Sequence, residues 1–187
     1  DMEILGHQLA QLHLRSQNNN VGFKEDNFIG TLSQSNKTHK HWIGFYIKER
    51  LQPQLKLAKN LTLLNSNEIP SDETMYSKLK QYLSNCKPSL LHGDLWSGNY
   101  LIAKDGTPYI IDPAVYYGHS EIDIAMSKLF GGFSNTFYKA YQKLIPFNTY
   151  TEDRIQLYQL YYLLVHLNMF GSSYYGAVKR ILNHYFK

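Results

Sequence analysis

The most informative residues of the chain are 90–113, which read LLHGDLWSGNYLIAKDGTPYIIDP. Two apolar runs, residues 100–103 and 109–111, flank the pair Asp105-Gly106. Aspartate followed by glycine between apolar runs is a strong signal for a tight turn that joins two antiparallel strands. The stretch therefore predicts a β-hairpin, preceded by a loop that is rich in polar residues and glycine.

The turn predicts which residues of the two strands face each other. A two-residue turn pairs Lys104 with Thr107 and, further from the turn, Asn99 with Asp112. Opposed residues share one face of the sheet, with Cβ atoms about 4.5–5.5 Å apart. An amide oxygen beside a carboxylate suits a hard cation such as Mg²⁺, whose other ligands are water and phosphate oxygens. This register therefore predicts a metal site at the open end of the hairpin.

A third polar residue lies in the loop before the first strand. Asp94 is flanked by Gly93 and Gly98, which allow the loop to place its carboxylate over the same site. Phosphoryl transfer needs a base that accepts the proton of the attacking hydroxyl and a metal that neutralises charge on the phosphates. The spacing His-x-Asp-x4-Asn, with Asp112 beyond it, matches the catalytic and metal-binding loops of protein kinases, with Gly93 in place of their arginine.

Each of these features has a simpler interpretation when it is taken alone. A His-Gly-Asp sequence is common, Asp105-Gly106 also serves as a plain turn, and Asp112 also serves to end a loop. The three polar residues nevertheless lie between runs as apolar as 90–91 and 110–111. Their combination favours a catalytic site over three unrelated local features.

Length, charge and cysteine content narrow the class of protein. The 187 residues are 43% apolar and 18% charged, which predicts a folded domain with its own core. The net charge is +4 and the basic residues are interleaved with apolar or acidic ones, so no nucleic-acid partner is indicated. No apolar run reaches the roughly 18–20 residues of a membrane span. The single cysteine, Cys86, is expected to be inert and indicates a reducing, cytoplasmic location.

Hydrophobic spacing predicts a mostly helical chain around a short strand-rich centre. Helices are expected over residues 3–14, 39–59, 75–83, 122–130, 134–144, 151–170 and 174–187, with a short extended or hairpin element over 21–32. Pro53 is expected to kink or end the second helix. No repeat or linker divides the chain, so the predicted fold is one α+β domain over residues 1–187, with a small β-hairpin that carries the site.

Several longer stretches of the sequence resemble the fructosamine/ketosamine kinase family, a branch of the aminoglycoside-phosphotransferase-like kinases. The resemblance covers essentially the whole chain and rests on LAQLH at 9–13, DNFIG at 26–30, LHGDLWSGN at 91–99, DPAVYYGHSE at 112–121 and LFGGF at 129–133. It implies the C-terminal lobe of a protein-kinase-like fold. It also implies ATP- and Mg²⁺-dependent phosphorylation of a sugar hydroxyl in a ketosamine, the product of a sugar and an amine.

The resemblance implies roles for the residues of the catalytic stretch. Asp94 would be the catalytic base, and Asn99 and Asp112 would be the metal ligands. Trp96 would form a wall near the sugar. These four residues are therefore the expected centre of the site.

Four further residues are implied at its margins. Asp123 resembles the buried aspartate that braces the catalytic loop from behind, and His92 is expected to support the same loop through a hydrogen bond. Phe130 and His166 are candidate residues of the substrate pocket. A packed helix end and a satisfied core histidine explain these last two equally well.

The resemblance also implies a part that the sequence does not show. Kinases of this superfamily carry a small sheet lobe with a loop over the phosphates, a strand lysine and a hinge for adenine. No glycine-rich phosphate loop precedes Leu14. We therefore expect the N-terminal nucleotide-binding lobe to be absent from this chain and to be its missing partner, and the chain alone to be inactive or a poor kinase.

Two other functions fit the same residues. A kinase for another small hydroxyl compound, such as an aminoglycoside or choline, would use the same chemistry. Aminoglycosides call for an acidic pocket, to which Glu121 and Asp123 contribute little. The second of these is a non-catalytic, kinase-like binding domain. The presence of all three chemical residues, Asp94, Asn99 and Asp112, argues against it. The amine that carries the sugar, the choice between free and protein-bound ketosamines and the oligomeric state stay open.

Overall fold

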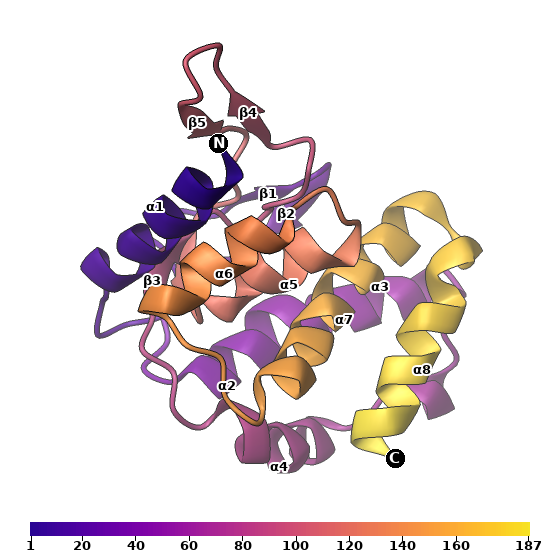
Figure 1. Cartoon of the computed structure of the whole chain (residues 1–187). Helices are drawn as coiled ribbons and strands as arrows, with labels where there is room; N and C mark the ends of the chain where they lie inside the picture. Colours follow the sequence, from indigo (N-terminus) through magenta and orange to yellow (C-terminus); the bar gives the residue numbers. More distant parts are fainter.

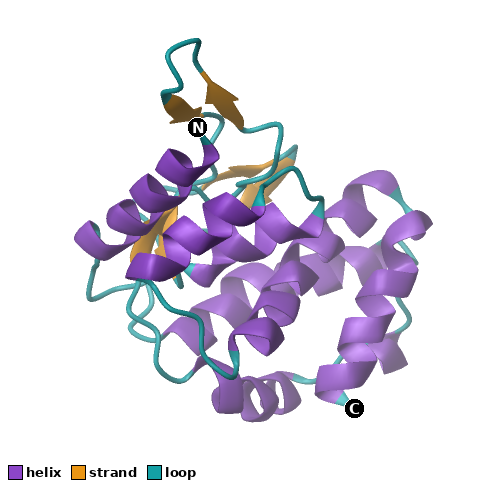
Figure 2. Cartoon of the chain, in the orientation of Figure 1, coloured by secondary structure: helices purple, strands orange, loops and turns teal.

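The structure is a computed structural model that describes residues 1–187, and it is α+β and mostly helical, as the sequence predicts (Figures 1 and 2). The α-helices are α1 (Met2–Arg15), α2 (Trp42–Phe45), α3 (Gln52–Asn60), α4 (Asp72–Leu83), α5 (Glu121–Leu129), α6 (Asn135–Leu144), α7 (Thr151–Phe170) and α8 (Tyr175–Phe186). A π-helical segment, η1 (Tyr46–Leu51), and two 3₁₀ turns, η2 (Ser66–Glu68) and η3 (Ser172–Tyr174), complete the helical elements. The strands are β1 (Asn27–Ile29), β2 (Leu32–Gln34), β3 (Ser89–Leu91), β4 (Tyr100–Ile102), β5 (Pro108–Ile110) and β6 (Tyr116–Gly118).

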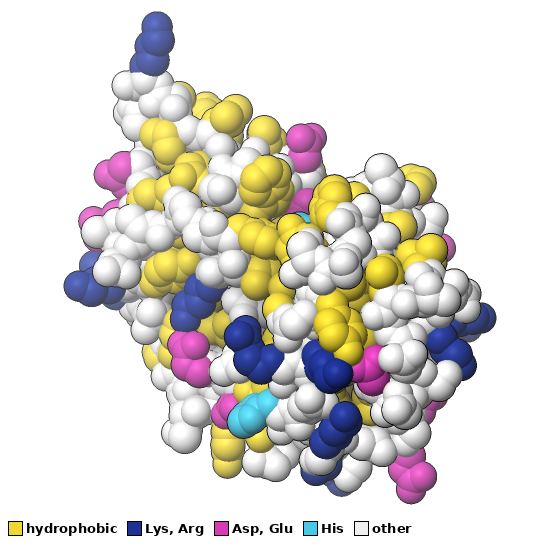
Figure 3. Space-filling model, turned by 90° about the vertical axis from the view of Figure 1, so that its right-hand side faces the viewer, with side chains coloured by type: hydrophobic (Ala, Val, Ile, Leu, Met, Phe, Trp, Pro, Cys, Tyr) yellow, Lys and Arg dark blue, Asp and Glu magenta, His cyan; other side chains and the backbone are white.

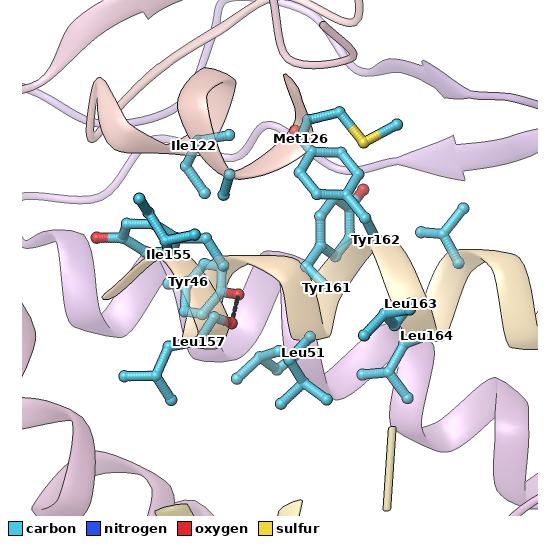
Figure 4. Packing of buried hydrophobic residues seen from close by; sticks show 14 of the residues in the cluster. Tyr46, Leu51, Ile122, Met126, Ile155, Leu157, Tyr161, Tyr162, Leu163 and Leu164 are labelled. Carbon is cyan, nitrogen blue, oxygen red and sulfur yellow. Dashed lines mark hydrogen bonds between the residues drawn. The ribbon is translucent and has the colours of Figure 1, made fainter. Parts of the chain in front are cut away.

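The hydrophobic core is organised around α7. Buried residues occur on nearly all sides of this helix, so it has no narrow apolar stripe. In Figure 4, Ile122 and Met126 of α5 lie on one side of α7, and Leu51 of η1 lies on the other. The hydroxyl of Tyr46 donates a 2.7 Å hydrogen bond to the carbonyl of Leu157, so its polar end is satisfied inside the core. Neither α7 nor any other helix combines the length and apolar character that a bilayer span requires.

The helical segment that begins at Trp42 continues past Pro53, so the proline does not end it. Proline has no N–H to donate to the carbonyl of Glu49, one turn earlier. The guanidinium of Arg50 donates to that carbonyl instead, at 3.0 Å. Arg50 is fully buried, and its guanidinium carbon lies 4.0 Å from the centre of the Tyr116 ring. The π-helical segment thus places the guanidinium of Arg50 against strand β6. The same guanidinium satisfies the Glu49 carbonyl, which Pro53 cannot bond.

The strands form three separate antiparallel pairs, β1–β2, β3–β6 and β4–β5. The β1–β2 hairpin begins inside the predicted 21–32 element and extends two residues beyond it. The β4–β5 hairpin projects from the helical body, at the top of Figure 1. Because β3 pairs with β6, the chain between them leaves and returns at the same end of one two-stranded ladder. A 2.8 Å hydrogen bond from the Ala114 N–H to the His92 carbonyl joins the two chain segments just beyond the ladder, one residue out of its register.

The predicted register of the β4–β5 hairpin is wrong by one residue. Leu101 lies opposite Tyr109, and the turn holds three residues rather than two. The N–H of Gly106 donates to the carbonyl of Ala103, and the N–H of Ala103 donates to the carbonyl of Thr107, both at 2.9 Å. Gly106 alone takes a positive φ, 86°, as a type I turn followed by a glycine bulge requires.

The shift changes the partner of the predicted metal ligand. Asn99 lies next to Ile111, whose N–H donates to the Asn99 carbonyl at 3.0 Å, and not opposite Asp112. Strand alternation therefore does not place the two side chains on one face. Any approach of Asn99 and Asp112 has to come from the loops at the base of the hairpin.

Helices α1 and α6 pack with their backbones in direct contact at Gly6. A Cβ atom at this position would lie 2.2 Å from the carbonyl oxygen of Phe137. We expect Gly6→Ala to lower the free energy of unfolding by about 1–3 kcal/mol, because the two backbones must separate to admit the methyl group. Gly176→Ala in α8, where nothing lies within 4 Å, is the matched control.

The control should raise the free energy of unfolding by up to about 1 kcal/mol, since alanine favours the helix over glycine. Urea denaturation of both variants measures the difference. Equal effects at the two positions would show that the close approach at Gly6 has no energetic consequence.

Candidate active site

The backbone of the catalytic loop, residues 92–99, is held from behind by Asp123. This side chain is fully buried at the start of α5. Its carboxylate accepts hydrogen bonds from the N–H groups of His92 and Gly93, both at 2.8 Å, and from Nε2 of His13 at 3.1 Å. Burial would raise the pKa of Asp123, but the hydrogen bond and charge of His13 outweigh it, and the pKa is lowered. Asp123 is therefore an ionised acceptor that fixes the start of the loop.

Gly93 is held on three sides. Its N–H bonds to Asp123, and its carbonyl accepts a 2.6 Å hydrogen bond from the hydroxyl of Tyr162 in α7. Its φ is 82°, and a Cβ atom there would lie 2.1 Å from the carbonyl oxygen of Ala114. Only glycine fits this position, because both the backbone conformation and the space exclude a side chain. The peptide next to Asp94 is consequently fixed by α5, α7 and the ladder.

His92 joins the catalytic loop to the chain just before Asp112. Its Nε2 donates to the carbonyl of Ile111 at 2.8 Å, and its Nδ1 accepts from the N–H of Asp94 at 3.2 Å. A carbonyl only accepts and an N–H only donates, so these bonds select the tautomer with the proton on Nε2. The structure thus places His92 where the expected support of the loop would be.

Asn99 brings the three predicted chemical residues together. Its Nδ2 donates to the backbone carbonyl of Asp94 at 2.9 Å and to the Asp94 carboxylate at 3.3 Å, and makes a longer contact of 3.5 Å with the carbonyl of Asp112. Side-chain contacts at the base of the hairpin, rather than strand register, therefore assemble the group. No protein donor bonds to Oδ1 of Asn99 or to the Asp112 carboxylate, so both oxygens are available to a ligand.

These two oxygens fit a hard cation such as Mg²⁺, which binds oxygen ligands and retains water and phosphate oxygens. Nowhere in the chain do three or more His, Cys, Asp or Glu side chains gather as a metal site. At a site that combines the amide of Asn99 with the carboxylate of Asp112, water and the oxygens of a phosphate-bearing ligand would fill the other positions around the metal.

Asp112 has a strained backbone. Its φ is 51°, in the left-handed region, and the following Pro113 restricts it further. A conformation of this kind costs about 1–3 kcal/mol and persists where surrounding structure imposes it. It turns the exposed Asp112 side chain out of the strand alternation, which is why the hairpin pattern did not predict its direction.

Asp94 lies half-buried at the centre of the site. Burial raises the pKa of its carboxyl group to about 6, although the hydrogen bond from Asn99 opposes the rise. A carboxylate with a pKa near neutrality accepts a proton more readily than an ordinary aspartate. Asp94 is thus suited to act as a general base.

A cavity of about 600 Å³ opens beside Asp94, between the catalytic loop, α5 and the C-terminal turns of α7. The three predicted pocket residues, Trp96, Phe130 and His166, all line it. No lysine or arginine lines the cavity, and Asp94 is its only acidic residue. Figure 3 shows hydrophobic side chains gathered in the upper half of one face of the molecule. The cavity is therefore mainly aromatic, with one carboxylate at its edge.

The aromatic wall of the cavity is held by local contacts. Nδ1 of His166 donates to the carbonyl of Tyr162 at 2.8 Å, and the His166 ring centre lies 4.6 Å from that of Phe130. Burial lowers the pKa of His166, so the ring is neutral and its Nε2 is a hydrogen-bond acceptor. The ring of Trp96 covers Gly98, where a Cβ atom would lie 2.3 Å from it.

The sequence interpretation missed residues on the α7 side of this cavity. Tyr162, His166 and Phe170 are spaced by four residues and lie along one side of α7, but only the histidine was singled out. The helical spacing was a signal that could have found the other two. The sequence also gives no signal for the contact between His13 and Asp123, because the two residues are 110 positions apart and no local pattern links them.

Comparison with known proteins agrees with this geometry. The family model described as fructosamine kinase matches residues 1–187. A probable ketoamine kinase of Enterococcus faecium is 42% identical over 191 residues, which cover 99% of this chain and 67% of the relative. The chloroplastic protein-ribulosamine 3-kinase of Arabidopsis thaliana is 40% identical, with 98% of this chain and 56% of the relative covered.

Solved structures give the same result. The crystal structure of a protein assigned as a fructosamine-3-kinase, from Haemophilus somnus, superposes with a TM-score of 0.87 at 30% identity and covers 100% of this chain and 63% of that one. The protein described here has the fold of proteins named as kinases. It belongs to the fructosamine kinase family. The chain spans 56–67% of the length of the two relatives described above.

The raised pKa of Asp94 predicts a pH-dependent stability. The folded state holds the proton more tightly than the unfolded chain, so ionisation of Asp94 reduces stability as the pH rises from about 4 to about 6. We expect Asp94→Asn to raise the free energy of unfolding at pH 7 by about 1–2 kcal/mol, because partial solvent contact screens the full effect. Urea denaturation at pH 7 and below pH 4 measures it.

The gain should vanish below pH 4, where Asp94 is protonated in both states. A stability change of the same size at both pH values would contradict the assigned titration of Asp94.

Proposed function

We propose that these residues form the catalytic centre of an ATP-dependent kinase that phosphorylates a sugar hydroxyl of fructosamines and related ketosamines. The observation that carries the proposal is the position of Asp94. Its carboxylate lies between the Asn99 amide, which contacts Asp112, and the aromatic cavity lined by Trp96. A base between a phosphate-side metal site and an acceptor pocket is the arrangement that phosphoryl transfer needs.

Each residue has a definable part in this reaction. Asp94 accepts the proton of the attacking hydroxyl, helped by a pKa of about 6. Oδ1 of Asn99 and the carboxylate of Asp112 would hold Mg²⁺, which would neutralise charge on the phosphates of ATP. The hydrogen bonds from Asn99 to Asp94 keep the base beside the metal ligands. His92 and Asp123 hold the loop and do not touch the reacting atoms.

The cavity supports a ketosamine as the substrate. Aromatic faces such as those of Trp96 and Phe130 pack against the apolar faces of a sugar, and Nε2 of His166 offers one acceptor for a hydroxyl. The absence of lysine and arginine from the lining means that a protonated amine on the sugar is not repelled. An aminoglycoside carries several amines, and a cavity with a single acidic residue offers them too few carboxylate partners. The relatives named as ketoamine and ribulosamine kinases support the same substrate class.

We also propose that the described residues are the C-terminal lobe of a protein-kinase-like enzyme. The relatives are longer than this chain, and their additional length is sufficient for a nucleotide-binding lobe. Such a lobe would supply the lysine and the adenine contacts that the described site does not contain. The exposed apolar side chains of the β4–β5 hairpin, among them Leu101 and Tyr109, are compatible with a surface that another lobe covers.

Substitution of the base tests the reaction. In a form of the protein that phosphorylates a ketosamine, we expect Asp94→Asn to lower turnover by about 10²- to 10⁴-fold, because the hydroxyl loses its proton acceptor. The wild-type rate should rise with pH through about 6, as Asp94 ionises. Asp105→Asn, the same change at the exposed turn of the β4–β5 hairpin, is the matched control and should leave turnover unchanged.

A substrate panel completes this test. Fructosyl-lysine, ribulosyl-lysine, an aminoglycoside and choline would be compared in a coupled assay of ADP release. Phosphorylation of choline or the aminoglycoside alone would replace the proposed substrate class, and Mg²⁺-independent binding without turnover of any compound would favour a binding domain.

The lobe assignment predicts the behaviour of the chain by itself. Without the lysine clamp and adenine contacts the chain loses most of its nucleotide affinity, so we expect turnover far below the roughly 1–100 per second of typical kinases. The same coupled assay on the 187-residue chain measures this rate. A rate within the typical range would refute the need for a second lobe.

A further inference from the structure

The LAQLH motif at residues 9–13 has no part in the proposed reaction, yet its last residue lies directly behind the catalytic loop. His13 is fully buried on α1. Its Nε2 lies 3.1 Å from the Asp123 carboxylate, and its Nδ1 lies 2.9 Å from the hydroxyl of Tyr141 on α6. The histidine therefore connects the closely packed α1–α6 pair to the acceptor that holds the loop.

The donors and acceptors in this group have definite roles. Asp123 is ionised and only accepts, so Nε2 of His13 carries a proton and donates it. Burial raises the pKa of Tyr141, which keeps its hydroxyl protonated, and this hydroxyl forms the hydrogen bond to Nδ1 of His13. Hydrogen bonds then run from Tyr141 through His13 to Asp123, which accepts from the N–H groups of the loop.

We propose that His13 is a positioning residue for the catalytic base, acting through Asp123. The carboxylate oxygen that accepts from His13 is the one that accepts from the N–H of His92, two residues before Asp94. Loss of the histidine donor leaves a fully buried carboxylate with only the two loop N–H groups. A buried carboxylate with fewer donors binds a proton more readily, and the protonated form holds the loop less firmly. The proposal rests on the proposed function only where it names Asp94 as the base.

Two amide substitutions separate the hydrogen bond from the packing. The amide of glutamine reaches the place of Nε2 and still donates to Asp123, whereas the amide of asparagine reaches only the place of Nδ1, on the Tyr141 side. Both His13→Gln and His13→Asn keep a buried polar side chain. His184→Asn, at an exposed position of α8, is the matched control.

Hydrogen exchange on the 187-residue chain, followed by NMR, is the first measurement. With His13→Asn we expect exchange of the His92 and Gly93 amides to accelerate by about 10- to 100-fold, which corresponds to one hydrogen bond to a charged group. Exchange of the Tyr117 amide, which bonds to the Gly22 carbonyl in a separate contact, should stay unchanged. His13→Gln and His184→Asn should match the wild type within about threefold.

Turnover of a ketosamine, in a form of the protein that includes the proposed nucleotide-binding lobe, is the second measurement. His13→Asn should lower kcat by about 10-fold or more and leave the KM of the ketosamine within about twofold, because only the base is displaced. Equal losses in His13→Asn and His13→Gln, or unchanged exchange of the loop amides in His13→Asn, would overturn the positioning role. If a longer form of the protein that includes the proposed nucleotide-binding lobe has no kinase activity, while the 187-residue chain shows the expected exchange pattern, the proposed function is rejected and the positioning role stays intact.

A third variant covers the case in which His13→Asn does not fold. Tyr141→Phe keeps the ring and removes only the hydroxyl that bonds to His13. It should accelerate exchange of the two loop amides by about 2- to 10-fold, the effect of one neutral hydrogen bond. Unchanged exchange in this variant would likewise overturn the proposal.

Discussion

The carboxylate of Asp123 is the interaction on which the site depends. It is fully buried, yet it is ionised, because the backbone N–H groups of two consecutive loop residues and the ring of His13 all donate to it. A buried charge is tolerated only when hydrogen bonds satisfy it, so the geometry around Asp123 permits little variation. The start of the catalytic loop is thereby tied to three helices, α1, α5 and α6, and Asp94 is placed relative to the helical body.

The β3–β6 ladder supplies the second constraint. The chain enters the site at His92 and leaves it at Ala114, and these residues are joined by a backbone hydrogen bond. Whatever lies between them must begin and end at one point. The catalytic loop and the residues around Asp112 are therefore neighbours for a topological reason, which holds whatever the register of the β4–β5 hairpin. Asn99 then makes the contact between them through its side-chain amide.

The two sides of Asp94 differ in their chemistry, and the difference supports the proposed substrate class. One side offers an amide oxygen and an exposed carboxylate without protein partners, and the other offers an aromatic cavity with no lysine or arginine. The first suits a metal that carries phosphates, and the second suits a sugar with a cationic substituent. The relatives show the fold and the family, whereas the roles proposed for the two sides of Asp94 are argued from this geometry.

The sequence by itself predicted most of the helices and the hairpin, and it proposed the chemical residues. The spacing of apolar residues predicted both ends of α7 correctly. The pattern from His92 to Asp112 predicted a hairpin, with a base and two metal ligands at its open end. Local patterns failed where the outcome depends on distant parts of the chain. The hairpin has a three-residue turn rather than the predicted two-residue one, and both lengths are common between antiparallel strands. Only the tertiary structure decided that Asn99 and Asp112 meet through the loops and that His13 reaches Asp123, because burial of a charge and closure of a ladder involve residues far apart in sequence.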